Sequence, residues 1–218
     1  MNCFVTGASG FIGANLVHEL RARGHRVRAL LRPNADTRGL ASVDFERVTG
    51  DLFNKKLLEH EIAGCDWCFH VAASYHLWLR DYAPMYAANV DGTRNVLEAA
   101  GKAGCQKIIY TSTVGCIGLP KFENGKFLPT DETTPVAEAQ MSNHYKRSKW
   151  LAEKIALELA PKKSARCHRQ SVRARRSARR ETDADRPSHR GFSQSQISCV
   201  SRHRLELDSR PRRRDWTY

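Results

Sequence analysis

The sequence lacks several features that would place it in a specialised class of protein. No secretory signal precedes the first predicted strand, and no apolar run approaches the roughly 18 residues of a membrane-spanning helix. Its seven cysteines are an odd number and show no regular disulfide framework. These absences argue against a disulfide-stabilised secreted domain and a helical membrane protein, and they predict a protein of the reducing cytoplasm.

Cysteine chemistry is also not expected at the one suggestive pair. Cys65 and Cys68 have the C-x-x-C spacing of redox centres and of half a zinc site. They lie at the start of the apolar run from Trp67 to Ala73, so we interpret them as buried strand cysteines. The sequence predicts no metal site.

Lysine is absent from residues 164–218, although the chain as a whole has a net charge of +13. This segment contains 15 arginines against six acidic residues. Such a segment can be a disordered arm that binds nucleic acid, attached here to a nucleotide-binding domain. A salt titration of RNA or DNA binding, with and without residues 164–218, would test that hypothesis.

The first thirteen residues contain the motif around which the following 150 or so are organised. A buried strand is predicted at residues 3–5 and an amphipathic helix at residues 14–23, with a G-x-x-G-x-x-G turn between them. Its first glycine permits the tight turn, the second lets the main chain approach a pyrophosphate, and the third lets the helix pack closely on the strand. Phosphates then bind at the helix N-terminus. The predicted cofactor-binding residues of this turn are Gly7, Ser9, Gly10, Phe11, Ile12 and Gly13.

Strands and helices alternate from this turn to about residue 160. The further strands are predicted at residues 26–31, 45–48, 67–73 and 107–112, and the further helices at residues 55–63, 83–104 and 145–160. The alternation predicts an α/β fold with a Rossmann-like, doubly wound parallel sheet. We expect this domain to occupy residues 1–163 and the sheet to be truncated after the fifth strand and its following helix.

The ends of the second, third and fourth strands predict the rest of the cofactor site. Arg32 follows the second strand without an adjacent acidic residue, and Asp36 lies four residues into the loop, which favours NADP, with NAD as the alternative. The alternative interpretation is that Arg32 is a solvated loop arginine. Asp51 either lies beside the adenine or caps the following helix. The small residues Ala72 and Ala73 would let a cofactor come close.

The candidate catalytic residues follow the fifth strand. Tyr145 and Lys149 are four positions apart, so both side chains share one helix face. A nearby ammonium lowers the phenol pKa from its usual value of about 10, and a tyrosine so tuned can exchange a proton with a carbonyl or an alcohol. A Y-x-x-x-K pair alone is commonly a surface pair. With the glycine turn and the strand-end hydroxyls it predicts an active site.

Residues 1–160 resemble the extended short-chain dehydrogenase/reductase superfamily, in its NAD(P)-dependent epimerase/dehydratase and dihydroflavonol-reductase-like branch. The amino-acid sequences of residues 70–78 and 144–149 are similar to the corresponding segments of the hopanoid-associated sugar epimerases. The motifs that carry the resemblance are T-G-A-S-G-F-I-G at residues 6–13, G-D-L at 50–52, H-V-A-A at 70–73, N-V-D-G-T at 89–93 and Y-x-x-x-K at 145–149.

The resemblance implies a role for each matched residue. Tyr145 is implied as the acid/base, Lys149 as its partner and a ribose ligand, and Asn89 as a residue that positions the lysine through water or backbone. A Ser or Thr is implied to bind the substrate oxygen; the family's spacing places it at Thr113, with Ser112 as the alternative. Asp51 and Leu52 are implied on the adenine side. The substrate would be a sugar or related molecule, or a ketone if the chain is dihydroflavonol-reductase-like, and the full-length form is compatible with a homodimer.

The resemblance stops after Ala160, where the family has a sixth strand and an Asn-Pro-Ser turn. Codons for residues 164–173, read one nucleotide later, can encode L-P-V-V-I-V-N-P-S, and two later segments give family-like sequences in the same register. We therefore predict that a frameshift makes residues 164–218 an out-of-frame, disordered tail. We expect this tail to bind no nucleic acid and the chain as written to be inactive.

Overall fold

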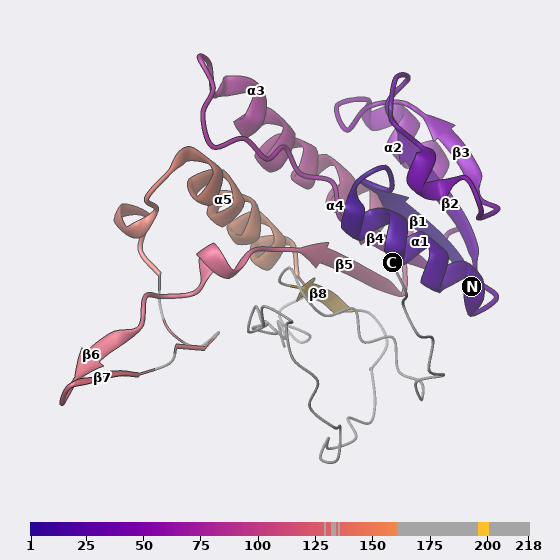
Figure 1. Cartoon of the computed structure of the whole chain (residues 1–218). Helices are drawn as coiled ribbons and strands as arrows, with labels where there is room; N and C mark the ends of the chain where they lie inside the picture. Colours follow the sequence, from indigo (N-terminus) through magenta and orange to yellow (C-terminus); the bar gives the residue numbers. More distant parts are fainter. Residues whose placement is uncertain (129, 132–133, 135, 161–195, 201–218) are drawn as a thin grey trace, which may run out of the picture.

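The structure is a computed structural model that describes residues 1–128, 130–131, 134, 136–160 and 196–200. Its main feature is a six-stranded parallel sheet with helices on both faces (Figure 1). The strand order is β3-β2-β1-β4-β5-β8, and the predicted doubly wound parallel sheet is confirmed. The strands are β1 (Asn2–Thr6), β2 (Arg26–Leu31), β3 (Glu46–Thr49), β4 (Trp67–His70), β5 (Lys107–Thr111) and β8 (Gln196–Val200).

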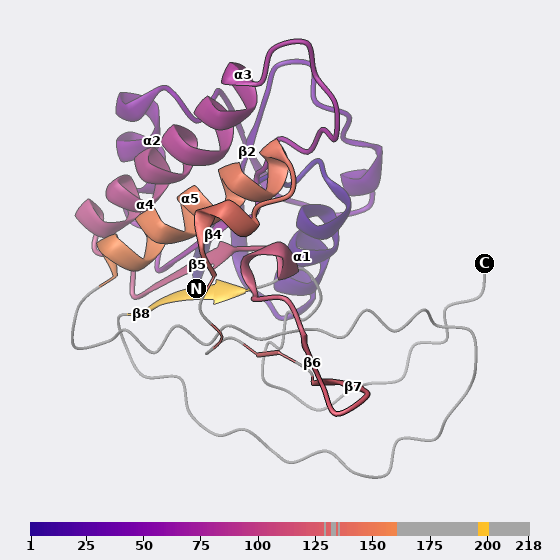
Figure 2. The same cartoon turned by 90° about the vertical axis from the view of Figure 1, so that its left-hand side faces the viewer.

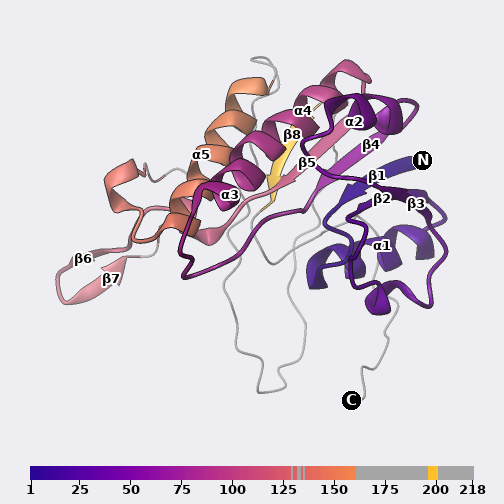
Figure 3. The ribbon, with the colours of Figure 1, turned by 90° about the horizontal axis from the view of Figure 1, so that it is seen from above.

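Helix α1 (Phe11–Ala22) covers one face of the sheet, and α2 (Lys55–Ile62), α4 (Gly92–Lys102) and α5 (His144–Leu159) cover the other (Figure 3). Each face has its own apolar cluster. Residues of α1 pack with Val5 on one side, and residues of the other three helices pack with Phe4 on the opposite side. The central strands read as continuous apolar runs because both of their faces are buried.

The sheet order reverses between β1 and β4. From β1 the chain proceeds outward through β2 and β3, and from β4 it proceeds in the other direction through β5. In open parallel sheets, ligands bind in the crevice at the carboxyl ends of the strands at such a switch point. The glycine turn follows β1 at this place.

The helix predicted over residues 83–104 is interrupted. It comprises α3 (Ala83–Tyr86), a π-helical turn at Ala87–Asp91 and α4. Single π turns inside helices are rare and are frequent at functional sites. Asn89 lies in this turn, and Figure 2 shows α4 and α5 side by side beyond it.

A small hairpin, which was not predicted from the sequence, lies between β5 and α5. Strands β6 (Lys121–Glu123) and β7 (Lys126–Leu128) pair antiparallel and project from the rest of the fold (Figures 1 and 2). Asn124 and Gly125 both have positive φ, 51° and 75°, as a two-residue hairpin turn requires. Short 3₁₀ turns lie at Arg38–Leu40, Val114–Cys116 and Glu138–Gln140.

The structure adds one strand to the five that the sequence predicts. Gln196–Val200 pairs in parallel with β5 over its whole length and lies beyond the strand at which the sheet was expected to end. Without a neighbour, the outer edge of β5 would present unpaired main-chain groups, which any extended segment can satisfy. The other expectations for residues 161–195 and 201–218 lie outside the described residues.

None of the helices in the described ranges is both long enough and apolar enough to cross a membrane.

Candidate active site

The glycine turn contains two positions that exclude any side chain. Gly7 has φ +74°, and a Cβ there would lie 2.5 Å from the main-chain nitrogen of Ala72, just after β4. A Cβ on Gly13 would lie 2.1 Å from the carbonyl oxygen of Gly7. The N–H of Gly10 donates to the same carbonyl at 3.0 Å and closes the turn. The roles predicted for Gly7 and Gly13 therefore have a steric basis in the structure.

The start of α1 fits a pyrophosphate group. Gly10 is the N-cap residue and makes no side-chain capping hydrogen bond. An α-helix leaves its first N–H groups without partners in the helix, and here they belong to Phe11, Ile12 and Gly13. Ser9 is exposed beside them. These N–H groups and the positive end of the helix dipole attract an anion.

The loop after β2 presents arginine rather than free carboxylate. Arg32 is exposed immediately after the strand. The carboxylate of Asp36 accepts hydrogen bonds from the Arg38 guanidinium at 2.7 and 3.1 Å, which lower the pKa of Asp36 to about 2. The nearest acid in this loop is thus already paired with a second arginine.

Asp51 follows β3, and the structure decides one of its two predicted roles. The N-cap of α2 is Asn54, whose side chain accepts from the N–H of Leu57 at 3.1 Å. The side chain of Asp51 accepts from the N–H of Phe53 at 3.0 Å and so stabilises the preceding turn instead. The neighbouring Leu52 accepts at its carbonyl from the side chain of Asn95 in α4, which fixes this strand end against the helix.

Tyr145 and Lys149 face the sheet from the first two turns of α5. Asn143 caps this helix by accepting from the N–H of Lys146 at 2.8 Å. Tyr145 is 7% exposed and Lys149 only 2%. The Lys149 ammonium donates to the carbonyl oxygen of Thr111 at 2.8 Å and lies 4.3 Å from the ring centroid of Tyr110. The shared helix face thus brings a buried cation to the carboxyl end of β5, one turn from the Tyr145 phenol.

The two candidate hydroxyls after β5 have different partners. Ser112 donates to the carboxylate of Glu153, a buried residue of α5. Thr113 caps the short 3₁₀ turn by accepting from the N–H of Gly115 at 3.3 Å. A hydroxyl proton committed to a buried carboxylate is not available to a ligand, so this geometry favours Thr113 over Ser112 as the substrate-binding hydroxyl.

Asn89 connects the loop after β4 with α5. Its side-chain amide donates to the carbonyl of Ser74 at 3.0 Å and to the hydroxyl of Ser148 at 2.9 Å, and its side-chain oxygen accepts from the N–H of Ser74 at 2.7 Å. The Ser148 hydroxyl donates to the carbonyl of Tyr145 at 2.8 Å. Asn89 therefore reaches the lysine helix through the residue that precedes Lys149.

No functional role was predicted from the sequence for Ser74 and Ser148, or for three fully buried polar residues. These are Thr6 at the end of β1, His70 at the end of β4 and Thr93 in α4, all at most 1% exposed. Burial, with a smaller contribution from the charge of Lys149, lowers the pKa of His70 to about 3. A histidine that ends an apolar strand needs hydrogen-bond partners, and this was the signal in the sequence.

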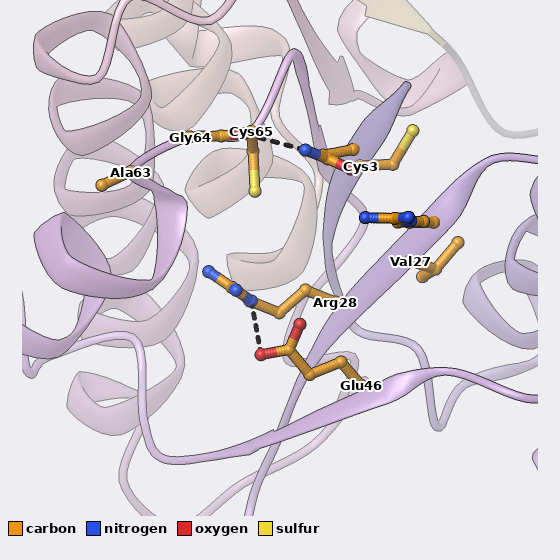
Figure 4. A pocket seen from close by; sticks show the side chains of 9 residues that line it. Cys3, Val27, Arg28, Glu46, Ala63, Gly64 and Cys65 are labelled. Carbon is orange, nitrogen blue, oxygen red and sulfur yellow. Dashed lines mark hydrogen bonds and ion pairs between the residues drawn. The ribbon is translucent and has the colours of Figure 1, made fainter.

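A hollow of about 150 Å³ lies at the opposite end of the sheet from the glycine turn (Figure 4). Arg28, Glu46 and Cys65 line it, and Arg28 forms an ion pair with Glu46 at 2.9 Å. Burial raises the pKa of Cys65 and places that of Cys68 well above its usual value, so both thiols are protonated, as expected of structural cysteines. No cluster of three or more metal-binding side chains occurs among the described residues.

Comparison with known proteins assigns the family. The model of the NAD dependent epimerase/dehydratase family matches residues 3–173, and the chain belongs to this family. It is 42% identical over 157 residues to a putative dihydroflavonol 4-reductase of Synechocystis sp.. The aligned region covers 72% of this chain and 44% of that protein. A ketoreductase of Stigmatella aurantiaca that acts on a farnesylated quinoline oxide is 34% identical over 158 residues, covering 72% and 46%.

Solved structures show the same fold. The crystal structure of gox2253 has a TM-score of 0.65 and 44% identity, covering 72% of this chain and 46% of that one. A short-chain dehydrogenase/reductase superfamily protein from Agrobacterium tumefaciens with bound NAD has a TM-score of 0.59 and 29% identity, covering 72% and 44%. The chain spans about half the length of the curated relatives it matches.

Proposed function

We propose that residues 1–163 form the dinucleotide-binding part of an enzyme that uses Tyr145 and Lys149 for proton transfer during hydride transfer. The observation that carries this proposal is the buried ammonium of Lys149 at the carboxyl end of β5, one helical turn from a buried tyrosine. A nicotinamide dinucleotide supplies or accepts the hydride when bound, and the glycine turn fits its pyrophosphate.

In this proposal each side chain acts on the substrate oxygen or on a neighbour of it. The Lys149 ammonium stabilises the phenolate of Tyr145. In the reducing direction, the Tyr145 phenol gives its proton to the carbonyl oxygen while Thr113 donates a hydrogen bond that orients the same oxygen. In the oxidising direction, the phenolate takes the alcohol proton. An epimerase would return the hydride to the opposite face of the same carbon.

A specific observation favours a ketone reductase over a sugar epimerase. Tyr75, Leu77 and Trp78 follow β4 and are 48%, 65% and 74% exposed, although all are large apolar side chains. The Tyr75 ring lies edge-on to the ring of Tyr145, with centroids 4.6 Å apart. An aromatic ring against that of Tyr145, in a loop with two further exposed apolar side chains, suits a ring-bearing ketone, as in a dihydroflavonol-reductase-like enzyme, better than a hydrated sugar nucleotide.

Dinucleotide binding tests the proposal on the chain as it stands. Lys149→Met should weaken NADPH binding about tenfold, through loss of the ribose contact. Lys154→Met, an exposed lysine of the same helix, is the matched control and should bind as the wild type does. Equal NADPH affinity of Lys149→Met and the wild type would contradict the role of this lysine.

The proposed cofactor preference is NADP. It is supported by Arg32 after β2 and by the pairing of Asp36 with Arg38. Arg32→Asp should lower affinity for NADPH and raise it for NADH, because a carboxylate repels the 2′-phosphate and accepts from the ribose hydroxyls. If Arg32→Ala binds NADPH as tightly as the wild type, the arginine has no such role.

We also propose that residues 164–218 are an out-of-frame segment and that the chain as written does not turn over substrate. The similarity to the Synechocystis protein, which extends over 157 residues or 72% of this chain, supports this proposal, whereas the family model continues to residue 173. The pairing of Gln196–Val200 with β5 does not contradict it, since an open strand edge accepts any extended segment. A gene sequence with stop codons in the alternative frame would refute it, and so would ketone reduction by the 218-residue chain at ordinary rates.

The reduced, buried thiols support a cytoplasmic location. A homodimer of the full-length form would be tested by its mass in solution.

A further inference from the structure

A line of buried hydrogen bonds connects the glycine turn with the π-helical turn. The hydroxyl oxygen of Thr6 lies 2.7 Å from Nδ1 of His70, and Nε2 of His70 lies 2.9 Å from the hydroxyl oxygen of Thr93. These three residues come from β1, β4 and α4. They are distant in sequence, so their convergence is a property of the folded sheet.

The donors and acceptors in this line can be assigned. The Thr93 hydroxyl donates its single proton to the carbonyl of Asn89 at 2.6 Å, so its oxygen can only accept from His70. Nε2 of His70 therefore carries a proton. Nδ1 then accepts from the Thr6 hydroxyl, whose oxygen in turn accepts from the N–H of Ala72 at 3.2 Å. One imidazole tautomer satisfies every member.

The line ends on a residue that already connects two parts of the site. Asn89 is held at its carbonyl by Thr93, and its side-chain amide bonds to Ser74 and Ser148. At the other end, Thr6 precedes Gly7, and Ala72 is the residue whose main chain excludes a side chain there. The same hydrogen bonds thus span the phosphate-binding turn and the first turns of α5.

We propose that His70 is a positioning residue which, with its proton on Nε2, holds the glycine turn and Asn89 in one fixed relation, so that both halves of a dinucleotide meet a preformed site. The inference rests on the proposed dinucleotide binding. His70 acts only through Thr6 and Thr93. Because burial lowers its pKa to about 3, the imidazole stays in this form at physiological pH.

Two variants of Thr93 separate the hydroxyl from the shape of the side chain. Thr93→Val keeps the β-branched shape and removes both hydrogen bonds, whereas Thr93→Ser keeps the hydroxyl. We expect Thr93→Val to weaken NADPH binding about tenfold and to shift the NMR signals of the Asn89 side-chain amide. Thr93→Ser should restore both readouts. Imidazole ¹⁵N spectra of the wild type should show the proton on Nε2.

A control variant is needed to show that a general loss of stability does not by itself weaken NADPH binding. Ile62→Val shortens a fully buried apolar side chain of α2 that belongs to the apolar cluster and not to the hydrogen-bond line, and it should lower stability without changing NADPH affinity. The inference is overturned if Thr93→Val leaves affinity and amide signals unchanged, if Ile62→Val weakens binding equally, or if the proton lies on Nδ1. If the wild type binds no dinucleotide, the proposed function fails, while the tautomer and the Asn89 signals still decide the hydrogen-bond line.

Discussion

The two ends of the parallel sheet contain polar groups of different kinds. At the amino end, charged side chains pair with each other: Arg28 contacts the carboxylate of Glu46 at 2.9 Å (Figure 4) and that of Glu61 at 3.6 Å. At the carboxyl end, Lys149 donates to the main-chain carbonyl of Thr111, and Asn89 donates to the carbonyl of Ser74. Charged partners occur at this end as well, since Asp36 pairs with Arg38 and Ser112 donates to the carboxylate of Glu153. Arg28 at the amino end is thus compensated by carboxylates, whereas the carboxyl end holds Lys149 and Asn89 in place and contains a turn in which Gly7 and Gly13 exclude side chains.

This difference bears on which end of the sheet can bind a ligand. A cavity whose charges are already paired has little left to offer a ligand. The first N–H groups of α1 have no partners within the helix, so the glycine turn keeps donors for a ligand. Residue identity alone does not separate the two ends, since both contain conspicuous charged residues.

The largest expected effect comes from filling the glycine turn. Gly13→Ala places a Cβ against the Gly7 carbonyl, so we expect a loss of more than about 3 kcal/mol of unfolding free energy and no measurable NADPH binding. Gly101→Ala is the matched control. A Cβ there meets no atom within 4 Å, and alanine in α4 should stabilise by up to about 1 kcal/mol. Urea unfolding and NADPH titration measure both, and equal effects of the two substitutions would contradict the steric argument.

The next effect is a pH dependence at His70. Between pH 6.5 and about 3, the unfolded chain binds a proton that the folded chain excludes at this residue. The free energy of unfolding should therefore fall as the pH drops, by up to about 1.4 kcal/mol per pH unit from this group, with no contribution above pH 6.5.

His70→Gln removes this titration while keeping a side-chain donor. The difference between its stability and that of the wild type should narrow as the pH falls from 6.5 toward 4. His60→Gln is the control, because the His60 side chain is 83% exposed, and it should follow the wild-type curve. A constant difference between His70→Gln and the wild type over this range would contradict burial of an uncharged imidazole.

The smallest effect is expected at the amino end. Glu46→Gln removes one carboxylate partner of Arg28, but both side chains are partly exposed and Arg28 still donates to the carbonyl of Glu61 at 2.6 Å. We expect less than about 1 kcal/mol of destabilisation and unchanged NADPH affinity. A change in dinucleotide affinity would show that the two ends are coupled.

Local sequence predicted much of the fold because its signals are short in range. The glycine turn, the apolar strands and the Tyr145–Lys149 spacing each depend on fewer than about a dozen neighbouring residues. The predicted end of β4 at Ala73 was three residues too late, because the apolar pattern continues past the last strand pair at His70. The π-helical turn at Asn89 was missed, since periodicity alone does not show where one extra residue enters a helix.

The sequence by itself determined the alternation of strands and helices, the places where a side chain is excluded, and the pairing of a tyrosine with a lysine on one helix face. Only the tertiary structure decided which partners the buried polar groups have. Ser112 donates a hydrogen bond to Glu153, and Asn54 rather than Asp51 caps α2. His70 forms hydrogen bonds with both Thr6 and Thr93. The physical reason is that hydrogen bonds between strands and helices are set by sheet order and register, and these bring together residues that no local pattern relates.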